Sequence, residues 1–318
     1  MSLLLVIHGA GRNWAPEPWL QRFSERLSGR RIVIANEQDG AVEGFRYAAV
    51  WKPRPGFLAR CKGLEVIFNL GAGIDALLRD RTLPNVPLVR IVNQDLSRRM
   101  TEYVVLHCLM HHRRQRALNE AQARCAWEAG EQPAASAVRV GILGLGALGR
   151  DAAEVLHRIG FQVAGWSLTR KALPGIQSYA GQGELDEFLA RTDILVALVP
   201  LTPATQGILN RGLFQKLARG GALGAPVLIN AGRGALQVEA DIVSCLDDGT
   251  LGAATLDVFQ EEPLPASSPF WRHPKVTVTP HNAADSDPEA ISDDIAAQIL
   301  DYEAGKPLRN VVDRGKGY

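Results

Sequence analysis

Three residues of the sequence have the chemistry to bind an acid and to move a proton. Arg233 lies between two glycines, Glu262 follows another acidic residue, and His281 follows a proline. A guanidinium binds a carboxylate through two parallel hydrogen bonds, and a histidine transfers a proton near neutral pH. A carboxylate beside a histidine orients the ring and favours its protonated form. Together the three residue types indicate acid–base chemistry on a substrate that carries a carboxylate.

Each of these residues follows an apolar segment of the length of a strand. The segments are residues 226–230, 253–258 and 275–279, in the same order. The carboxyl ends of parallel strands lie at one edge of a sheet, where ligands bind in open α/β folds. Taken singly, a surface arginine, a solvated acidic turn and a loop histidine are the simpler interpretations. Three such residues at successive strand ends favour a catalytic site.

The same sheet is predicted to bind a dinucleotide. Residues 138–143 form an apolar run that leads into Gly144, Gly146 and Gly149, and a helical pattern then extends to Gly160. Between a strand and a helix, these glycines allow a tight turn, backbone approach to a pyrophosphate and close packing. The helix N-terminus presents free N–H groups to the anion. The predicted strands are residues 138–143, 161–165, 193–199, 226–230, 253–258 and 275–279, and the predicted apolar helix face is Leu148, Ala152, Val155, Leu156 and Ile159.

The residues after the second strand favour NADPH over NADH. An NAD site normally has an acidic residue about 20 positions after the glycines, which binds the ribose 2′-hydroxyl. No acidic residue lies between Glu154 and Glu184, and the second strand leads into Ser167, Arg170 and Lys171. A hydroxyl and two cations suit a 2′-phosphate. A basic solvated loop on an NAD enzyme is the alternative, so weaker use of NADH stays open.

The first part of the chain predicts a second α/β sheet. Short apolar strands alternate there with helical or turn segments, which is typical of a parallel sheet covered by helices. This part contains no G-x-G-x-x-G motif, so we expect it to bind something other than the dinucleotide. The predicted strands are residues 3–7, 31–35, 47–51, 65–69 and 88–92, with a helix over 16–27.

The last part of the chain predicts a helix that returns to the first sheet. It begins with a capping box from Ser286 to Glu289 and ends near Gly305. A helix that follows a completed sheet has no strand to pair with there. The residues expected on its apolar face are Ile291, Ile295 and Ile299. The expected domains are 1–97 (first part of one discontinuous domain), 98–285 (dinucleotide-binding domain) and 286–318 (return to the first).

Residues 95–126 predict one long linking helix. Four of its side chains have helical spacing that suits metal ligands, but no carboxylate or second cysteine completes a closed coordination shell. Packing is therefore favoured, and no metal is expected. The relevant residues are the apolar face (Tyr103, Val104, Leu106, Leu109 and Met110), the candidate ligands (His107, Cys108, His111 and His112) and a solvated or subunit-facing edge (Arg113, Arg114 and Arg116).

Composition restricts the compartment and the partners. The chain has 318 residues, 46% of them hydrophobic, and a formal net charge of +1, which gives no overall field that favours nucleic acid. The apolar N-terminal run has no basic flank and is too short for a signal peptide or a membrane span. Cys61, Cys108, Cys125 and Cys245 form no C-x-x-C motif and are expected to be reduced thiols. We therefore expect a cytoplasmic protein with no membrane or nucleic-acid partner.

Several motifs resemble those of the D-2-hydroxyacid dehydrogenase family. They extend from residue 69 to 283 and include GAG followed by Asp75, GLGALG, VPLTPAT, NAGRG, LDVFQEEPLP and TPHNA. The closing VDRGKGY, Trp51 and the WSLTRK stretch are similar to members of the family that reduce glyoxylate and hydroxypyruvate. The resemblance implies a Rossmann dinucleotide-binding domain, a discontinuous flavodoxin-like substrate domain and a homodimer built on the long helix.

The resemblance also implies roles for the matching residues. Arg233 would orient the substrate, His281 would be the general acid and Glu262 its partner. Asp257 would contact the nicotinamide carboxamide. The implied substrate-binding residues are Trp51, Leu70, Gly71, Ala72, Gly73, Arg233 and His281. The implied cofactor-binding residues are Gly144, Gly146, Ala147, Leu148, Gly149, Ser167, Arg170, Lys171, Val199, Pro200, Thr205, Ala231, Gly232, Arg233, Asp257, His281 and Ala283.

The implied activity is the NADPH-dependent reduction of small 2-oxo acids, from glyoxylate to glycolate and from hydroxypyruvate to D-glycerate. Hydride delivery builds negative charge on the carbonyl oxygen, which a protonated histidine can neutralise. Another dehydrogenase of the family, such as a phosphoglycerate type, is the nearest alternative. A nucleotide-sensing, corepressor-like binding protein has the same fold and can keep the same three residues, so the fold alone does not exclude it.

Overall fold

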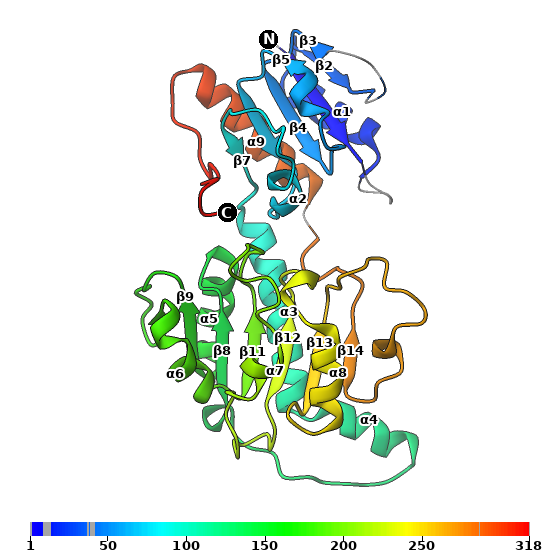
Figure 1. Ribbon diagram of the computed structural model, residues 1–318, viewed down its shortest axis with the longest axis vertical. Coiled ribbons are helices and arrows are strands. Elements are labelled where there is room, and N and C mark those ends of the chain that lie inside the picture. Colours follow the sequence, from blue (N-terminus) through cyan, green and yellow to red (C-terminus); the bar gives the residue numbers. More distant parts are fainter. Residues whose placement is uncertain (1, 9–13, 37, 39–41, 286, 318) are drawn as a thin grey trace. The chain divides into compact units, whose positions relative to one another are not determined.

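The computed structural model of the chain describes residues 2–8, 14–36, 38, 42–285 and 287–317. The chain divides into two compact units, Met1–Leu96 with Ser286–Tyr318, and Ser97–Asp285. Each unit has its own parallel sheet and its own helices (Figure 1). We propose that the two units are the two predicted domains. The first boundary then follows residue 96, one residue before the predicted position after residue 97.

The main sheet of the first unit has five parallel strands in the order β2-β1-β4-β6-β7. This is the strand order of a flavodoxin-like sheet, the fold that the family resemblance implied. All residues of β1 are buried, which explains why the strands read as continuous apolar runs. A further pair of short parallel strands, β3 and β5, was not predicted. The bounds are β1 Ser2–Ile7, β2 Arg31–Ile34, β3 Val42–Glu43, β4 Tyr47–Trp51, β5 Cys61–Lys62, β6 Val66–Asn69 and β7 Leu88–Val89.

The C-terminal helix belongs to the first unit, as the sequence predicted. Helix α9 (Pro288–Glu303) packs beside α1 (Pro16–Arg26), and α2 (Asp75–Leu78) is a short helix of the same unit. The three isoleucines expected on the inner face of α9 are fully buried against the sheet. The hydrophobic core of the first unit therefore needs residues from both ends of the chain.

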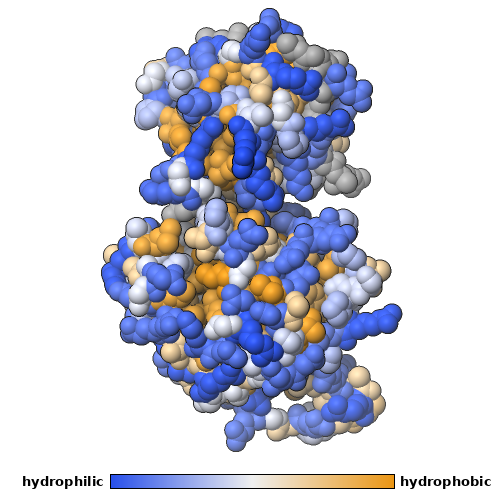
Figure 2. All heavy atoms as spheres, viewed as in Figure 1, coloured by the Kyte–Doolittle hydropathy of each residue, from blue (hydrophilic) through white to orange (hydrophobic). Residues whose placement is uncertain are grey.

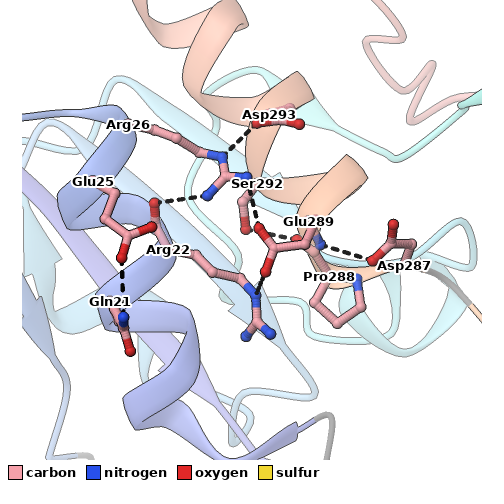
Figure 3. A network of polar contacts seen from close by, with 9 residues as sticks. All are labelled: Gln21, Arg22, Glu25, Arg26, Asp287, Pro288, Glu289, Ser292 and Asp293. Atoms are coloured by element: carbon pink, nitrogen blue, oxygen red, sulfur yellow. Dashed lines mark hydrogen bonds and ion pairs between the residues drawn. The ribbon is translucent and has the colours of Figure 1, made fainter.

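Ion pairs join the first turns of α9 to α1 (Figure 3). The Glu289 carboxylate accepts hydrogen bonds from Arg22 Nε at 2.6 Å and from Arg26 Nη2 at 2.7 Å. These two arginines lower the pKa of Glu289. Asp287 caps the helix, since its side chain accepts a hydrogen bond from the Glu289 backbone N–H at 3.0 Å. The predicted capping residue, Ser286, lies outside the described residues.

The sheet of the second unit has seven parallel strands in the order β10-β9-β8-β11-β12-β13-β14. The chain reverses direction across the sheet between β8 and β11, which is where doubly wound sheets bind ligands. The sequence predicted six strands and missed β10, because this edge strand reads QSYA and has no apolar run. The bounds are β8 Arg139–Leu143, β9 Gln162–Ser167, β10 Gln177–Ala180, β11 Ile194–Ala197, β12 Val227–Asn230, β13 Ala253–Leu256 and β14 Val276–Val278.

The helix that follows the glycine motif is close to the one predicted. Gly160, with φ 109°, ends it in the left-handed region that favours glycine. The prediction was wrong for Ile159, which is 39% exposed at the last turn; Ala153 is buried instead. This helix is α5 (Ala147–Ile159), and further helices of the unit are α6 Leu185–Ala190, α7 Arg211–Phe214 and α8 Glu239–Asp247.

The predicted long linking helix is interrupted. It forms α3 (Gln94–His112) and α4 (Gln115–Ala123), separated by Arg114 with φ 55°. No glycine or proline marks this break in the sequence. Val104 is buried as predicted, but Leu106 is 53% exposed and does not belong to the buried face.

The arginines near the break differ in environment. Arg113 and Arg114 are exposed, as predicted. Arg116 was expected at a solvated edge, but its Nη1 donates to the Pro274 carbonyl at 2.6 Å and its Nη2 to Thr277 Oγ1 at 2.7 Å. Arg116 therefore attaches α4 to the last strand of the sheet.

The surface is mostly hydrophilic on the face drawn in Figure 2, and hydrophobic residues form small separate groups there. No helix in the described part of the chain is long and apolar enough to cross a membrane. All four cysteines are free, and only Cys125 is exposed.

Candidate active site

The turn between β8 and α5 has room for a bound group on its outer side. Gly144 has φ 116°, and a Cβ there would lie 2.8 Å from backbone atoms of Leu198 and Val199. A Cβ at Gly149 would lie 2.0 Å from the Gly144 carbonyl oxygen, so helix and strand pack backbone to backbone. At Gly146, in contrast, no atom lies within 4 Å of a Cβ position. The first N–H groups of α5 therefore adjoin open space, which suits a pyrophosphate.

The neighbouring turn after β11 is held by threonine. Thr205 Oγ1 donates to the Pro200 carbonyl at 2.7 Å and accepts from the Thr202 N–H at 2.8 Å. Since the Val199 backbone nitrogen lies beside Gly144, the two turns line the reversal point of the sheet together.

The basic segment after β9 contains an ion pair that the sequence did not predict. Arg170 Nη1 donates to the Ser178 carbonyl at 2.5 Å, and Nη2 pairs with the Glu184 carboxylate. The Ser167 hydroxyl donates to a backbone carbonyl within the segment. The Lys171 ammonium forms no ion pair in the described part of the chain. An open hollow beside this segment is lined by Arg170, Lys171, Ala172, Leu173, Pro174, Ile176, Gln177 and Ser178.

The loop that carries Arg233 is fixed by the last residue of β12. Asn230 Oδ1 accepts from the Gly232 N–H at 3.1 Å, and its Nδ2 donates to the Arg233 carbonyl at 3.2 Å. A Cβ at Gly234 would lie 1.8 Å from the Phe259 carbonyl oxygen. The loops after β12 and β13 are therefore in direct backbone contact, and only glycine fits between them.

His281 and Glu262 form the pair that the sequence predicted. His281 Nδ1 lies 2.7 Å from Glu262 Oε2, and Glu262 Oε1 accepts the Phe259 N–H at 3.0 Å. Both carboxylate oxygens are engaged, so the carboxylate has a fixed direction. The His281 side chain is 51% exposed, and its Nε2 has no hydrogen-bond partner within the described residues. The ring is thus oriented at Nδ1 and open to a ligand at Nε2.

Asp257 holds the loop on which His281 lies. Its side chain is buried, and Oδ1 accepts hydrogen bonds from Thr279 Oγ1 at 2.6 Å and from the Asn282 N–H at 3.0 Å. Oδ2 accepts the Ala283 N–H at 3.0 Å. The geometry thus supports a positioning role for Asp257, and its contact with a nicotinamide carboxamide stays a prediction.

In the first unit, the glycine loop after β6 adjoins a tryptophan stack. A Cβ at Gly71 would lie 2.4 Å from Trp51 Cζ3, so the ring covers this part of the backbone. The Trp14 ring stacks on Trp51 with a centroid distance of 4.0 Å and an interplanar angle of 10°. Within the described residues, the N–H groups of Gly71, Ala72 and Gly73 donate no hydrogen bond.

Leu70 departs from its expected role. Its N–H donates to the Val50 carbonyl at 2.9 Å, which extends the pairing of β6 with β4, and the residue is fully buried. An N–H that already belongs to the sheet is not available to a ligand. The backbone of the loop therefore offers donors only from Gly71 onwards.

Comparison with known proteins decides the family. The model of the D-isomer specific 2-hydroxyacid dehydrogenase NAD-binding domain matches residues 105–283, more than half of the chain. Glyoxylate/hydroxypyruvate reductase A of Serratia proteamaculans is 42% identical over 308 residues, 95% of this chain and 96% of the relative. The chain belongs to the D-isomer-specific 2-hydroxyacid dehydrogenase family. The resemblance seen in the sequence motifs is thereby confirmed.

Solved structures of the dehydrogenase family share the fold along the whole chain. The NADPH-dependent glyoxylate/hydroxypyruvate reductase of Sinorhizobium meliloti, in complex with NADP and sulfate, has 45% identity and a TM-score of 0.93 and covers 100% of this chain and 99% of its own. A probable 2-hydroxyacid dehydrogenase of Rhizobium etli, in complex with NADP, HEPES and tartaric acid, has 43% identity and a TM-score of 0.92, with the same coverage.

Sequence reasoning missed the polar residues that position the candidate site of this dehydrogenase. Asn69 and Asn230 are the last residues of buried strands that lead into glycine loops, and this pattern could have indicated them. The other residues act through contacts with residues farther along the chain. The Tyr103 hydroxyl, for example, lies 2.8 Å from Thr279 Oγ1, 176 residues away. The missed residues are Asn69, Tyr103, Glu184, Asn230 and Thr279.

The candidate metal ligands on α3 contact different neighbours in the dehydrogenase fold. Within the described residues, no three His, Cys, Asp or Glu side chains are grouped in a way that could hold a metal ion. His107 packs on Tyr103, Cys108 is fully buried, His111 Nε2 lies 2.9 Å from Thr255 Oγ1, and His112 packs on Phe161.

The environment of the half-buried His111 predicts lower stability in acid. Burial, and then the nearby charges of His107 and Arg116, lower the pKa of His111 to about 4. Between this value and the ordinary value near 6.5, the unfolded chain binds a proton that the folded dehydrogenase does not. Stability should therefore fall as pH falls, by about 1–2 kcal/mol from this residue between about pH 7 and pH 5.

Urea unfolding at the two pH values measures this effect. His111→Gln keeps a polar side chain beside Thr255, and glutamine does not bind a proton in the folded or the unfolded chain. The acid-induced loss should be smaller in this variant by the contribution of His111. An equal loss in the variant and the wild type would show that His111 does not carry the effect.

Proposed function

We propose that the protein reduces small 2-oxo acids with NADPH, converting glyoxylate to glycolate and hydroxypyruvate to D-glycerate. The observation that carries this proposal is the His281–Glu262 pair at 2.7 Å, at the strand ends of a dinucleotide-binding sheet whose adjacent loop carries Arg233. The names of the Serratia and Sinorhizobium relatives, which specify the same two substrates, support it.

The side chains of the second unit suit the charge that develops in such a reduction. When bound, NADPH supplies a hydride to carbon 2 of the oxo acid. Arg233 holds the carboxylate and the carbonyl oxygen through its planar guanidinium. His281 Nε2 hydrogen-bonds the carbonyl oxygen and donates its proton to it, so hydride and proton together complete the hydroxyl-bearing product. Glu262 keeps the ring oriented through its contact with Nδ1.

The first unit supplies groups that suit the acid end of the substrate. We assign the N–H groups of Gly71, Ala72 and Gly73 to the carboxylate, since backbone N–H groups without internal acceptors bind anions. Trp51 limits the space beside them, which favours substrates with a short carbon chain.

NADPH preference is assigned to the segment after β9. Replacing Lys171 or Arg170 by alanine should lower the affinity for NADPH about 10- to 150-fold, the range for a lost charged hydrogen bond. The affinity for NADH should stay nearly unchanged. Fluorescence titration with both cofactors measures these affinities.

The ion pair with Glu184 provides the control for Arg170. If Arg170 only held the segment in place, its removal would weaken NADPH and NADH equally, and Lys171→Ala would have no effect. Glu184→Gln removes the competing charge and keeps an oxygen for the Ala180 N–H, which the carboxylate binds at 2.8 Å. This variant should bind NADPH at least as well as the wild type.

We also propose a cytoplasmic homodimer formed through α3 and α4. Large apolar side chains there are exposed, including Leu106, Leu118 and the fully exposed Trp127 beyond α4, and burial against a second copy would remove them from water. Free cysteines suit a reducing compartment. Light scattering after gel filtration tests the dimer directly.

Product analysis tests the proposed reaction. Hydroxypyruvate and NADPH should give D-glycerate in equal amount to the NADP formed, as resolved by chiral chromatography. L-glycerate would contradict the assigned family chemistry. Binding of NADPH without turnover of any 2-oxo acid would favour a nucleotide-sensing binding protein instead.

A further inference from the structure

Asn69 is a buried amide directly behind the loop assigned to the substrate carboxylate. It is the last residue of β6 and only 2% exposed. Its Nδ2 donates two hydrogen bonds, to the Gly71 carbonyl at 2.7 Å and to the Gly73 carbonyl at 2.9 Å. Both N–H groups of the amide therefore donate to the same short loop.

These hydrogen bonds determine which way the loop presents its peptide groups. In a trans peptide the carbonyl and the following N–H point in opposite directions. Because the carbonyls of Gly71 and Gly73 point towards Asn69, the N–H groups of Ala72 and Ile74 point away from it. Ile91 N–H also donates to the Gly71 carbonyl, at 3.2 Å, which holds the first of these peptides from a second side.

The outward N–H groups find no acceptor in the described part of the chain. Backbone N–H groups that point the same way bind anions, and the Ala72 N–H is one of those assigned to the substrate carboxylate. The Trp51 ring lies against Gly71 and prevents the loop from moving to that side. The position of the loop is therefore set by Asn69 on the inside and by Trp51 beside it.

We propose that Asn69 is a positioning residue that sets the affinity of the loop for the substrate carboxylate. The proposal rests on the proposed reduction of 2-oxo acids. Without the amide, two carbonyl oxygens lose their donors, and the peptides are free to rotate away from the arrangement that presents the N–H groups. The loss should concern recognition of the carboxylate and leave NADPH binding, which uses the other unit, unchanged.

The test compares Asn69→Ala and Asn69→Ser with the wild type. Oxamate, an unreactive analogue of a 2-oxo acid, is titrated against the protein saturated with NADPH, and oxamide serves as the matched ligand without a carboxylate. Asn69→Ala should lower the affinity for oxamate about tenfold or more, whereas the affinities for oxamide and NADPH should change little. The KM for glyoxylate should rise by a similar factor, whereas kcat should change by less than about threefold. Asn69→Ser keeps one donor, so its loss should be intermediate.

Gln298→Ala is the control for a general loss of stability. Gln298, on α9, is also a buried amide of the first unit and is 2% exposed. Its Oε1 accepts the Arg309 N–H at 3.0 Å, away from the loop. This variant should lose stability and keep its preference for oxamate over oxamide.

The outcomes separate this inference from the function on which it rests. If the wild type reduces glyoxylate but Asn69→Ala or Asn69→Ser binds oxamate with unchanged affinity, the role of Asn69 is overturned and the proposed function is not. An equal loss of affinity for oxamate, oxamide and NADPH also overturns this role, because Asn69 would then be merely structural. A wild type that reduces no 2-oxo acid overturns the proposed function, and this inference with it. If Asn69→Ala does not fold, the comparison of Asn69→Ser with Gln298→Ala decides.

Discussion

Replacing Arg233 with lysine is expected to lower kcat/KM for glyoxylate and hydroxypyruvate by about a hundredfold or more, although the charge is kept. A planar guanidinium can bind the carboxylate and the carbonyl oxygen at the same time, whereas an ammonium acts as a point charge. The backbone of the loop should keep its shape in this variant, because Asn230 holds it through main-chain groups. Steady-state kinetics measure the loss.

The affinity for NADPH is the control for Arg233→Lys. It should stay near the wild-type value, since the glycine turn before α5 and the segment after β9 are untouched. A variant with normal kcat and only a changed free energy of unfolding would give Arg233 a structural role in place of the assigned one.

His281→Ala is expected to lower kcat by about 10²- to 10⁴-fold at every pH, the range for loss of a general acid. Glu262→Gln should behave differently. The ring keeps a hydrogen-bond acceptor at Nδ1 and with it its orientation, so kcat should fall much less than in His281→Ala. Steady-state kcat values of the two variants measure this difference.

Glu262→Ala is the matched control, because it removes the acceptor at Nδ1 altogether. Its kcat should fall further than that of Glu262→Gln. A Glu262→Ala enzyme with the kcat of the wild type would mean that the 2.7 Å contact does not hold the ring for proton transfer.

The sequence predicted those parts of the fold that depend on local pattern. Gly144, Gly146 and Gly149 were identified because the turn, the strand before it and the helix after it are consecutive. Strand β10 was missed, because an edge strand needs little apolar surface and its residues are largely polar. The break at Arg114 was missed because a non-glycine residue occupies the left-handed conformation there.

The sequence predicted the functional groups of the candidate site but not the side-chain contacts that position them. His281 and Glu262 are 19 residues apart, and their pairing followed from the strand ends that carry them. The clamp of Asp257 on the His281 loop and the ion pair of Arg170 with Glu184 depend on side-chain directions that no spacing reveals. Polar residues in such contacts look like ordinary strand-end or surface residues in the sequence.

The most direct test of the central claim is a steady-state comparison of both cofactors with glyoxylate, hydroxypyruvate and pyruvate. NADPH should be oxidised with glyoxylate and hydroxypyruvate, and kcat/KM with NADPH should exceed that with NADH by about tenfold or more, the effect of one charged contact to the 2′-phosphate. No oxidation of NADPH with any of the three acids, or a preference for NADH, would contradict the assignment of this chain as an NADPH-dependent 2-oxo acid reductase.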